Sequence, residues 1–243
     1  MTYTTYLDTL PDPSNPIGEA GEPGGTNGPG YSSVRLSSEH KIMNTRTNSG
    51  RLISRELSGH KWNISIGYNP MTREEFEPVY TFLLQKRGSM TPFFVSLPQY
   101  KVPRNSDFAT FVASNNFSPS VAAGESGGTT MMIENANFSS SNNGSARLGD
   151  IFTITDTDSN HKKTYQITRV ETHNNYESNT TGPISSQLRI HFIPALQRPV
   201  TTNATINFNN PKFRVVLKND IQEYSLNSEN LYSFSLELEE AQP

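Results

Sequence analysis

The pattern that most restricts the fold of this chain is a strict alternation of apolar and polar residues near its end. In LYSFSLELEEA, the apolar positions are Tyr232, Phe234, Leu236 and Leu238. Side chains two positions apart lie on one face of a strand, so this stretch predicts a half-buried β-strand. The same alternation occurs in KWNISIGY, with Trp62 on the apolar face, and in KFRVVLK, with Phe213 on it. We expect these three strands to share one sheet.

A helix is predicted directly after the Trp62 strand, and it is the only convincing helix of the sequence. Thr72 with Glu75 three residues later is typical of a capping box. Gly88, which follows two basic residues, favours a left-handed helix end. The run PFFVSLP comes next and predicts a strand that carries Phe93. The stripe expected to face the sheet consists of Phe76, Val79, Tyr80, Leu83 and Leu84. One helix covers one face of a sheet, which leaves the other face or the edges for neighbours.

The middle of the chain is rich in Ser, Thr, Asn and Gly and has a turn signal about every ten residues, which favours an antiparallel β-sandwich or barrel. Its predicted strands are 129–134, 149–155, 163–170, 187–194 and 204–208. We therefore expect a mainly β protein: a small β-sheet domain with one bracing α-helix and an inserted antiparallel β-sandwich or barrel domain. The expected parts are an N-terminal arm (1–30), the sheet domain (31–104 and 210–243) and the inserted domain (105–209).

The segment from Pro11 to Gly30 is about half Pro and Gly and has almost no aliphatic side chains. Such a segment cannot offset its ordering entropy with a core of its own. It is either a flexible linker or tail, or an extended arm that lies on a neighbouring subunit. The arm would be anchored at its far end by Tyr3, Tyr6 and Leu10.

The composition argues against several classes of protein. The net charge of −3 gives no general attraction to nucleic acid or to an anionic membrane. The absence of cysteine excludes disulfides, thiolate zinc sites and a cysteine nucleophile. Neither a membrane span nor a secretory signal is recognisable. The apolar share, counted with Gly and without Tyr, is about 36 %, against a usual 45–50 %. Part of the chain is therefore solvated, or its surface is covered by partner subunits.

No catalytic or metal-binding pattern stands out. The five histidines show no metal-ligand spacing, and DTDSN (156–160) lacks the Gly and Glu that a calcium loop needs. The cluster Glu74, Glu75 and Glu77 complements the dipole at the predicted helix start. We expect no enzyme, no cofactor and no metal. A carboxylate pair that cleaves polysaccharide is the least favoured alternative. A module that binds a host glycan is a stronger one, because aromatic residues stand in predicted loops: Phe117, Phe138 and Tyr176.

The order of the motifs resembles a known family. A strand with Trp62 leads into a helix that ends in Arg87-Gly88 and then into a Pro–Phe strand. The inserted part carries LGDIFTI (148–154), YQITRV (165–170) and a run from Leu188 to Val200, and the closing strands follow. This arrangement, from about Leu52 to Ala241, is similar to the distal-tail and baseplate structural proteins of tailed bacteriophages.

The resemblance implies a virion structural protein, assembled in the host cytoplasm, that forms a ring at the distal end of the phage tail. The ring is commonly a hexamer, and it joins the tail tube to the hub and to fibre or adhesion proteins. No nucleic acid or membrane insertion is expected, and a host glycan is an optional ligand. The residues expected to carry the structure and its assembly are Trp62, Phe76, Tyr80, Leu83, Gly88, Phe93, Phe213, Tyr232 and Phe234.

Overall fold

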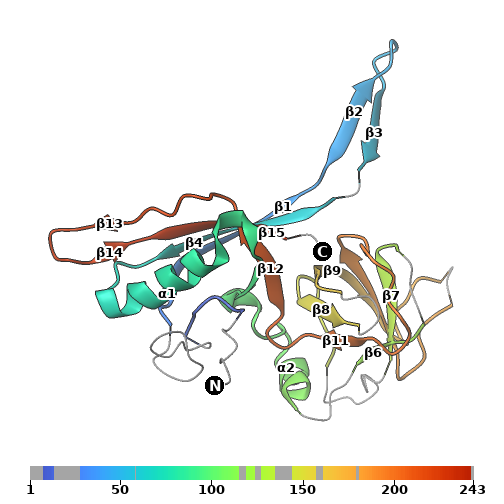
Figure 1. The fold of residues 1–243 in the computed structure, drawn as a ribbon. Coiled ribbons are helices and arrows are strands. Elements are labelled where there is room, and N and C mark those ends of the chain that lie inside the picture. Colours follow the sequence, from blue (N-terminus) through green and yellow to red (C-terminus); the bar gives the residue numbers. More distant parts are fainter. Residues whose placement is uncertain are drawn as a thin grey trace. The chain divides into compact units, whose positions relative to one another are not determined.

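The computed structural model describes residues 8–13, 28–57, 59–114, 119–123, 127–134, 144–156, 161–178 and 181–241. They form two compact units, one within Met1–Val95 and Arg214–Gln242 and the other within Ser96–Phe213 (Figure 1). Strands dominate both units, so the mainly β class predicted from the sequence is confirmed. Among the described helices, none is long and apolar enough to cross a membrane.

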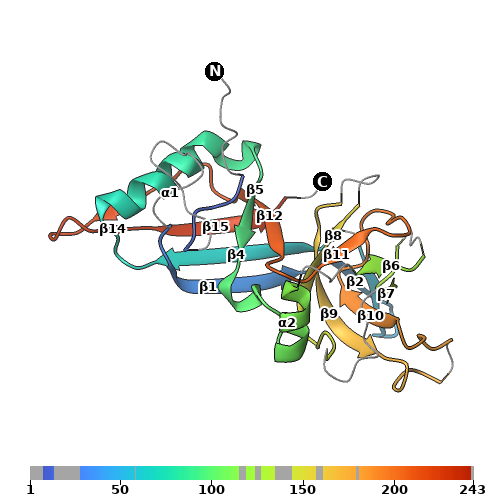
Figure 2. The ribbon, with the colours of Figure 1, turned by 90° about the horizontal axis from the view of Figure 1, so that it is seen from below.

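The first unit is built on a five-stranded sheet with the order β1-β4-β15-β12-β5 (Figure 2). Its strands are β1 (Tyr31–Glu39), β4 (Lys61–Tyr68), β15 (Ser235–Glu240), β12 (Lys212–Leu217) and β5 (Phe93–Ser96). β4 and β15 pair antiparallel, with Leu238 opposite Ile64 and Leu236 opposite Ile66. The prediction that the stretches around residues 62 and 234 meet in a single β layer is therefore confirmed.

Helix α1 (Arg73–Lys86) packs on one face of this sheet. It begins with the predicted capping box, in which the backbone N–H of Thr72 donates to the Glu75 carboxylate at 3.0 Å. A short 3₁₀ turn (Gly88–Met90) follows its end and leads into β5. The helix is thus held at both ends by the local signals of the sequence.

The predicted apolar stripe of α1 was wrong in its last turn. Leu84 is 52 % exposed, and Phe82 is buried instead. The ring of Phe82 packs edge-on against Phe93 of β5, with the ring centroids 5.4 Å apart. The start of the helix faces Phe234, whereas its end faces β5, so the buried stripe turns toward Phe82 along the helix. Periodicity shows that a helix has a buried side, but the neighbouring elements decide where that side ends.

Residues 8–13 cover the β5 edge of the sheet. The N–H of Leu10 donates to the carbonyl of Phe94 at 2.8 Å, and the N–H of Phe94 donates to the carbonyl of Asp8 at 2.6 Å. The Asp8 carboxylate also accepts from the buried ammonium of Lys86 on α1, at 3.1 Å. Leu10 is fully buried. In the described part of the predicted arm, Leu10 is thus anchored on the sheet of its own chain, and the two N-terminal tyrosines lie outside the described residues.

Two hairpins extend from the sheet, and the sequence patterns did not predict them. One consists of β2 (Ile42–Arg46) and β3 (Leu52–Glu56), and the other of β13 (Ser225–Leu226) and β14 (Tyr232–Ser233). Tyr232 also forms an antiparallel bridge with Met71, just before α1. The predicted strand from Tyr232 onward is therefore divided between the second hairpin and β15.

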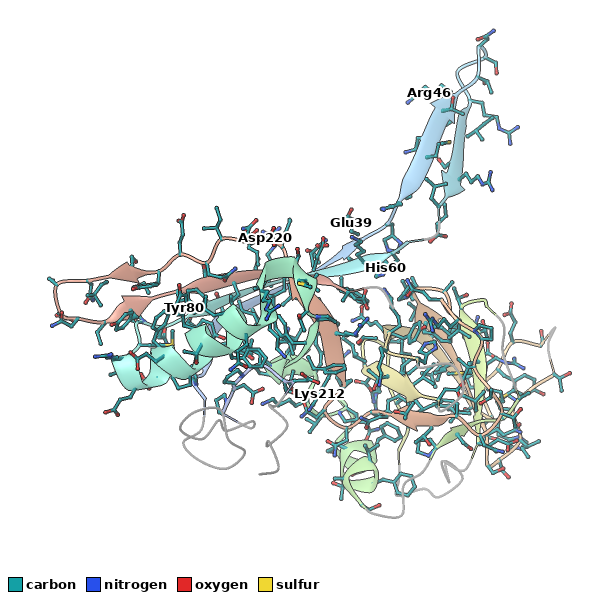
Figure 3. The ribbon with its side chains drawn as sticks, viewed as in Figure 1. Glu39, Arg46, His60, Tyr80, Lys212 and Asp220 are labelled. Atoms are coloured by element: carbon teal, nitrogen blue, oxygen red, sulfur yellow. The ribbon has the colours of Figure 1, made fainter. Side chains whose placement is uncertain are left out.

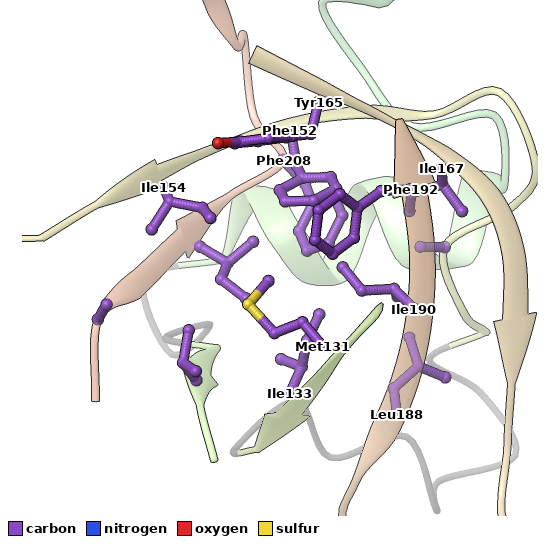
Figure 4. Close-up of a cluster of buried hydrophobic side chains, with 14 of the residues drawn as sticks. Met131, Ile133, Phe152, Ile154, Tyr165, Ile167, Leu188, Ile190, Phe192 and Phe208 are labelled. Carbon is purple, nitrogen blue, oxygen red and sulfur yellow. The ribbon is translucent and has the colours of Figure 1, made fainter. Parts of the chain in front are cut away.

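The second unit contains a closed antiparallel barrel with the order β10-β7-β6-β11-β8-β9. Its strands are β6 (Ser120–Val121), β7 (Thr130–Glu134), β8 (Ile151–Thr155), β9 (Thr164–Glu171), β10 (Leu188–Ile193) and β11 (Thr205–Asn207). The five strands predicted for this region are present, and β6 is an additional strand. Of the two predicted architectures, the barrel is the one observed, and the sandwich is not. Aromatic and aliphatic side chains, among them Phe152, Tyr165 and Phe192, fill its interior (Figure 4).

The expectation that the chain has one helix was wrong. The second unit carries α2 (Ser106–Ala113) and a 3₁₀ turn (Pro98–Tyr100). The side chain of Asn105 caps α2 by accepting from the N–H groups of Asp107 and Phe108, at 3.0 and 3.1 Å. Phe108 is fully buried in the barrel core. This short helix is stabilised by packing rather than by its own propensity.

Candidate assembly surfaces

Four of the predicted structural residues meet in an aromatic cluster between α1 and the β13–β14 hairpin. The ring centroid of Phe76 lies 4.6 Å from that of Tyr232 and 5.6 Å from that of Phe234. Tyr80 stacks on Phe76 at 5.2 Å. Tyr224 completes the cluster at 5.1 Å from Phe76, and the sequence patterns missed it because it stands in a polar stretch without alternation. The cluster fixes the second hairpin to the helix.

The other predicted structural residues lie elsewhere. Leu83 and Phe93 are fully buried where the end of α1 meets β5, and Phe213 is fully buried on β12. Trp62 is 3 % exposed and contacts the ring of His60 edge-on at 4.8 Å. The backbone N–H of Trp62 donates to the carboxylate of Glu240, at 3.1 Å. These side chains hold the unit together from inside, so they are not themselves a surface.

Gly88, the remaining predicted residue, forms a tight contact after α1. Its φ of +67° lies in the left-handed region, and a Cβ at this position would come within 2.5 Å of the Asp220 carboxylate. Asp220 accepts hydrogen bonds from the backbone N–H and the hydroxyl of Ser89, each at 2.9 Å. These two bonds lower the pKa of Asp220 below its usual value. The contact ties the start of the 219–231 segment to the end of the helix.

We expect Gly88→Ala to destabilise the protein by about 2–4 kcal/mol, because it adds a clash with Asp220 to the strain of a positive φ. Gly50→Ala is the matched control: its φ is +80°, but a Cβ there has no neighbour within 4 Å. The control should cost only about 1 kcal/mol. Urea unfolding of both variants measures the difference, and equal costs would show that Asp220 does not constrain this position.

The β2–β3 hairpin, with its flanking residues 41–57, is exposed on both faces and is called the basic hairpin here. It carries Lys41 and three arginines against a single carboxylate, Glu56. It also exposes apolar side chains, from Leu57 at 39 % to Met43 at 59 %. Among the described residues, none forms an ion pair with these three arginines. A two-stranded ribbon of this kind is marginally stable alone.

Where the basic hairpin joins the sheet, two histidines lie within hydrogen-bond distance of one serine hydroxyl. The hydroxyl of Ser38 lies 3.0 Å from Nε2 of His40 and 2.8 Å from Nε2 of His60. The two imidazoles contact each other edge-on at 4.7 Å, and the N–H of Leu57 donates to the carbonyl of Lys41 at 2.8 Å. These contacts connect the hairpin to β1 and β4, which lie next to it in the chain (Figure 3).

The segment 219–231, which contains β13 and the turn that leads to β14, is called the acidic hairpin here. It carries Asp220, Glu223 and Glu229 and has no lysine or arginine. It also exposes large apolar side chains, with Ile221 at 74 % and Leu226 at 51 %. The two hairpins therefore combine exposed apolar side chains with opposite charge. Their turn signals are visible in the sequence, but their exposure is not.

The barrel unit carries a buried carboxylate, Glu171, beside two arginines and a histidine. Arg189 and His191 lie 2.9 Å from its oxygens, and Arg169 lies 3.2 Å away. Burial raises the pKa of Glu171, but the hydrogen bonds from His191 and Arg189 and the nearby arginine charges outweigh burial, so the pKa is lowered. The lowered pKa favours the ionised carboxylate, which connects β9 to β10 through Arg189 and His191.

A second titratable group of this unit, His161, is 4 % exposed. Its Nε2 lies 2.6 Å from the Tyr165 hydroxyl. Burial lowers the pKa of His161 to about 4, since it outweighs the charge of Asp156, and Arg198 acts in the same direction as burial. The neutral imidazole is therefore part of the folded state.

The folded protein should lose stability as the pH falls from 6.5 to about 4. In this window the unfolded chain binds a proton at residue 161 and the folded chain does not. We expect a loss of the order of 2 kcal/mol, allowing for solvent screening. His161→Gln removes this titration, so its free energy of unfolding should fall less than that of the wild type between pH 7.5 and pH 4.5. Parallel pH profiles of the two proteins would contradict the assignment.

The aromatic residues proposed for glycan binding are only partly described. Phe117 and Phe138 lie outside the described residues. Tyr176 is 44 % exposed, and its ring lies over Gly182, where a Cβ would come within 2.7 Å of the ring. Over the described part of the chain, no group of three His, Cys, Asp or Glu side chains is placed to hold a metal ion.

Comparison with known proteins points to phage tail proteins. No protein-family model matches the chain. Distal tail protein pb9 of Escherichia phage T5 is 26 % identical to it over 216 residues, which cover 88 % of this chain and 93 % of that protein. This similarity supports a relationship with phage distal tail proteins and a structural role in a phage tail. It favours a structural role over an enzymatic one.

Proposed function

We propose that this chain is a virion structural protein that forms a ring, commonly a hexamer, at the distal end of a phage tail. The ring would join the tail tube to the hub and to fibre or adhesion proteins, and it would assemble in the host cytoplasm. The observation that carries the proposal is the similarity to distal tail protein pb9, which extends along nearly the whole length of both chains.

The structure supports the proposal in a second way. On two hairpins the first unit exposes apolar side chains that its own core does not cover, among them Ile42, Met43 and Ile221. Monomeric proteins rarely leave such side chains gathered on one element, and gathered apolar side chains mark interaction sites. In an assembly of several subunits, these surfaces can contact neighbouring copies. In a closed ring, every copy makes the same contacts with its two neighbours.

The direct test is made on the particles of the phage whose genome encodes the chain. Mass spectrometry of the purified particles should detect the chain, and electron microscopy of particles labelled with an antibody against it should place the label at the distal tail end. Absence of the chain from purified particles would overturn the proposal. Presence at another position, such as the capsid, would keep a structural role but remove the distal ring.

A host-surface glycan remains the second proposed partner. Among the described residues, the exposed ring of Tyr176 supports it. Because one exposed tyrosine is common on protein surfaces, this proposal ranks below the structural one.

A further inference from the structure

We propose that the basic hairpin (41–57) of one copy docks onto the acidic hairpin (219–231) of a second copy, in a head-to-tail contact. This inference rests on the proposed ring, and it names the two surfaces that would form the contact. Three observations support the proposed contact: the positions of the two segments, their charges and their exposed apolar side chains.

The two hairpins lie at opposite ends of one strand. The basic hairpin precedes Lys61, the first residue of β4, and its neighbour Glu39 pairs with Lys61. The acidic hairpin precedes Ser235, which pairs with Gly67 at the other end of β4. The eight residues of β4 include seven rises, which separate its two ends by about 23 Å. The basic hairpin and the acidic hairpin of one chain therefore project from opposite ends of the sheet (Figure 1).

The charges of the two segments are complementary. The basic hairpin has four cations against one carboxylate, and the acidic hairpin has three carboxylates and no cation. Within the described residues, Arg46, Arg51 and Arg55 make no ion pair, and the same holds for Glu223 and Glu229. Opposite charge steers two surfaces into register and disfavours the pairing of like with like. It therefore selects contact between the two different hairpins over contact between two identical ones.

Apolar side chains supply the remaining part of the contact. Because neighbours along a strand point to opposite faces, Ile42 and Leu52 lie on one face of the basic hairpin, and Met43 and Ile53 lie on the other. The acidic hairpin exposes Ile221, Tyr224 and Leu226. A ribbon that is apolar on both faces is suited to insertion against a neighbour rather than to lying on a flat surface.

A contact between two different surfaces has a structural consequence. It repeats from copy to copy, so it produces a closed ring when the rotation between copies closes, and an open filament otherwise. The proposal therefore connects these segments directly to ring formation.

The test uses charge reversal in the full-length chain. One variant carries Arg46→Glu and Arg55→Glu, and a second carries Glu223→Lys and Glu229→Lys. Asp220 is left unchanged because it holds Ser89. Association is measured by light scattering and analytical ultracentrifugation over a range of protein and salt concentrations. A matched control reverses two exposed cations of the barrel unit, Arg147→Glu and Lys162→Glu.

We expect each hairpin variant to weaken self-association by about 100-fold and the control to associate as the wild type does. An equimolar mixture of the two hairpin variants should regain most of the lost affinity, because each reversed hairpin then meets a reversed partner. Association of the wild type should weaken with added salt. Loss of association without recovery in the mixture would contradict the pairing.

The outcomes separate this inference from the proposed function. Hairpin variants that form the wild-type oligomer would overturn the hairpin contact and leave the ring intact. A wild-type chain that stays monomeric up to about 0.5 mM, yet is present in purified particles, would also overturn the hairpin contact. That result would indicate that the hairpins bind another tail protein instead of a second copy. Absence from the particles is the result that removes the proposed function itself.

Discussion

Trp62→Ala should lower the free energy of unfolding by about 3–5 kcal/mol. The side chain is 3 % exposed on β4, the strand that lies between β1 and β15. Its removal leaves a cavity next to His60, at the end of the sheet from which the basic hairpin extends. The loss should appear in urea unfolding followed by circular dichroism.

Leu84→Ala is the control for this variant. Leu84 lies on α1 in the same unit but is 52 % exposed, so we expect its truncation to cost less than about 0.5 kcal/mol. A loss below about 1 kcal/mol for Trp62→Ala would mean that Trp62 does not belong to the core and that the faces of β4 are assigned wrongly.

Phe152→Ala should destabilise the barrel unit by a similar amount, about 3–5 kcal/mol. The ring is fully buried and contacts three other aromatic rings. The centroid distances are 5.5 Å to Tyr165, 5.6 Å to Phe192 and 5.7 Å to Phe208. Truncation removes the centre of this cluster, and the closed barrel around it limits how far the remaining rings can collapse into the space.

Limited proteolysis of the folded variants would show which unit is destabilised. Cleavage within 96–213 should increase in Phe152→Ala, whereas the exposed neighbour Leu148→Ala should behave as the wild type does. Equal protection of the two variants would show that the aromatic cluster contributes little to the stability of the barrel.

Much of the fold was predictable from the sequence because alternation reports a strand with one buried face. The strands that carry Trp62, Phe213 and Leu236 each have one face in the core, and all three were found. The capping box and Gly88 likewise located both ends of α1, since they are local signals. The five barrel strands were found for the same reason.

The basic hairpin escaped prediction because neither of its faces is buried. Its apolar residues stand in adjacent pairs, Ile42-Met43 and Leu52-Ile53, so they point to both faces and produce no alternation. Helix α2 was missed because eight residues with Thr and Val inside give a weak helical signal, and packing of Phe108 decides its formation. The candidate surfaces depend on exposure, which a single sequence does not report.

The backbone bonds between residues 8–10 and β5 restrict how sheets of different copies can join. One margin of the sheet is already occupied by this short segment, and among the strands that the structure describes none pairs with the free side of β1 at the other margin. A sheet with a single open margin can add at most one other strand of this kind, so growth by strand addition stops at two copies. The arrangement therefore limits the repeated strand addition that produces amyloid-like fibres.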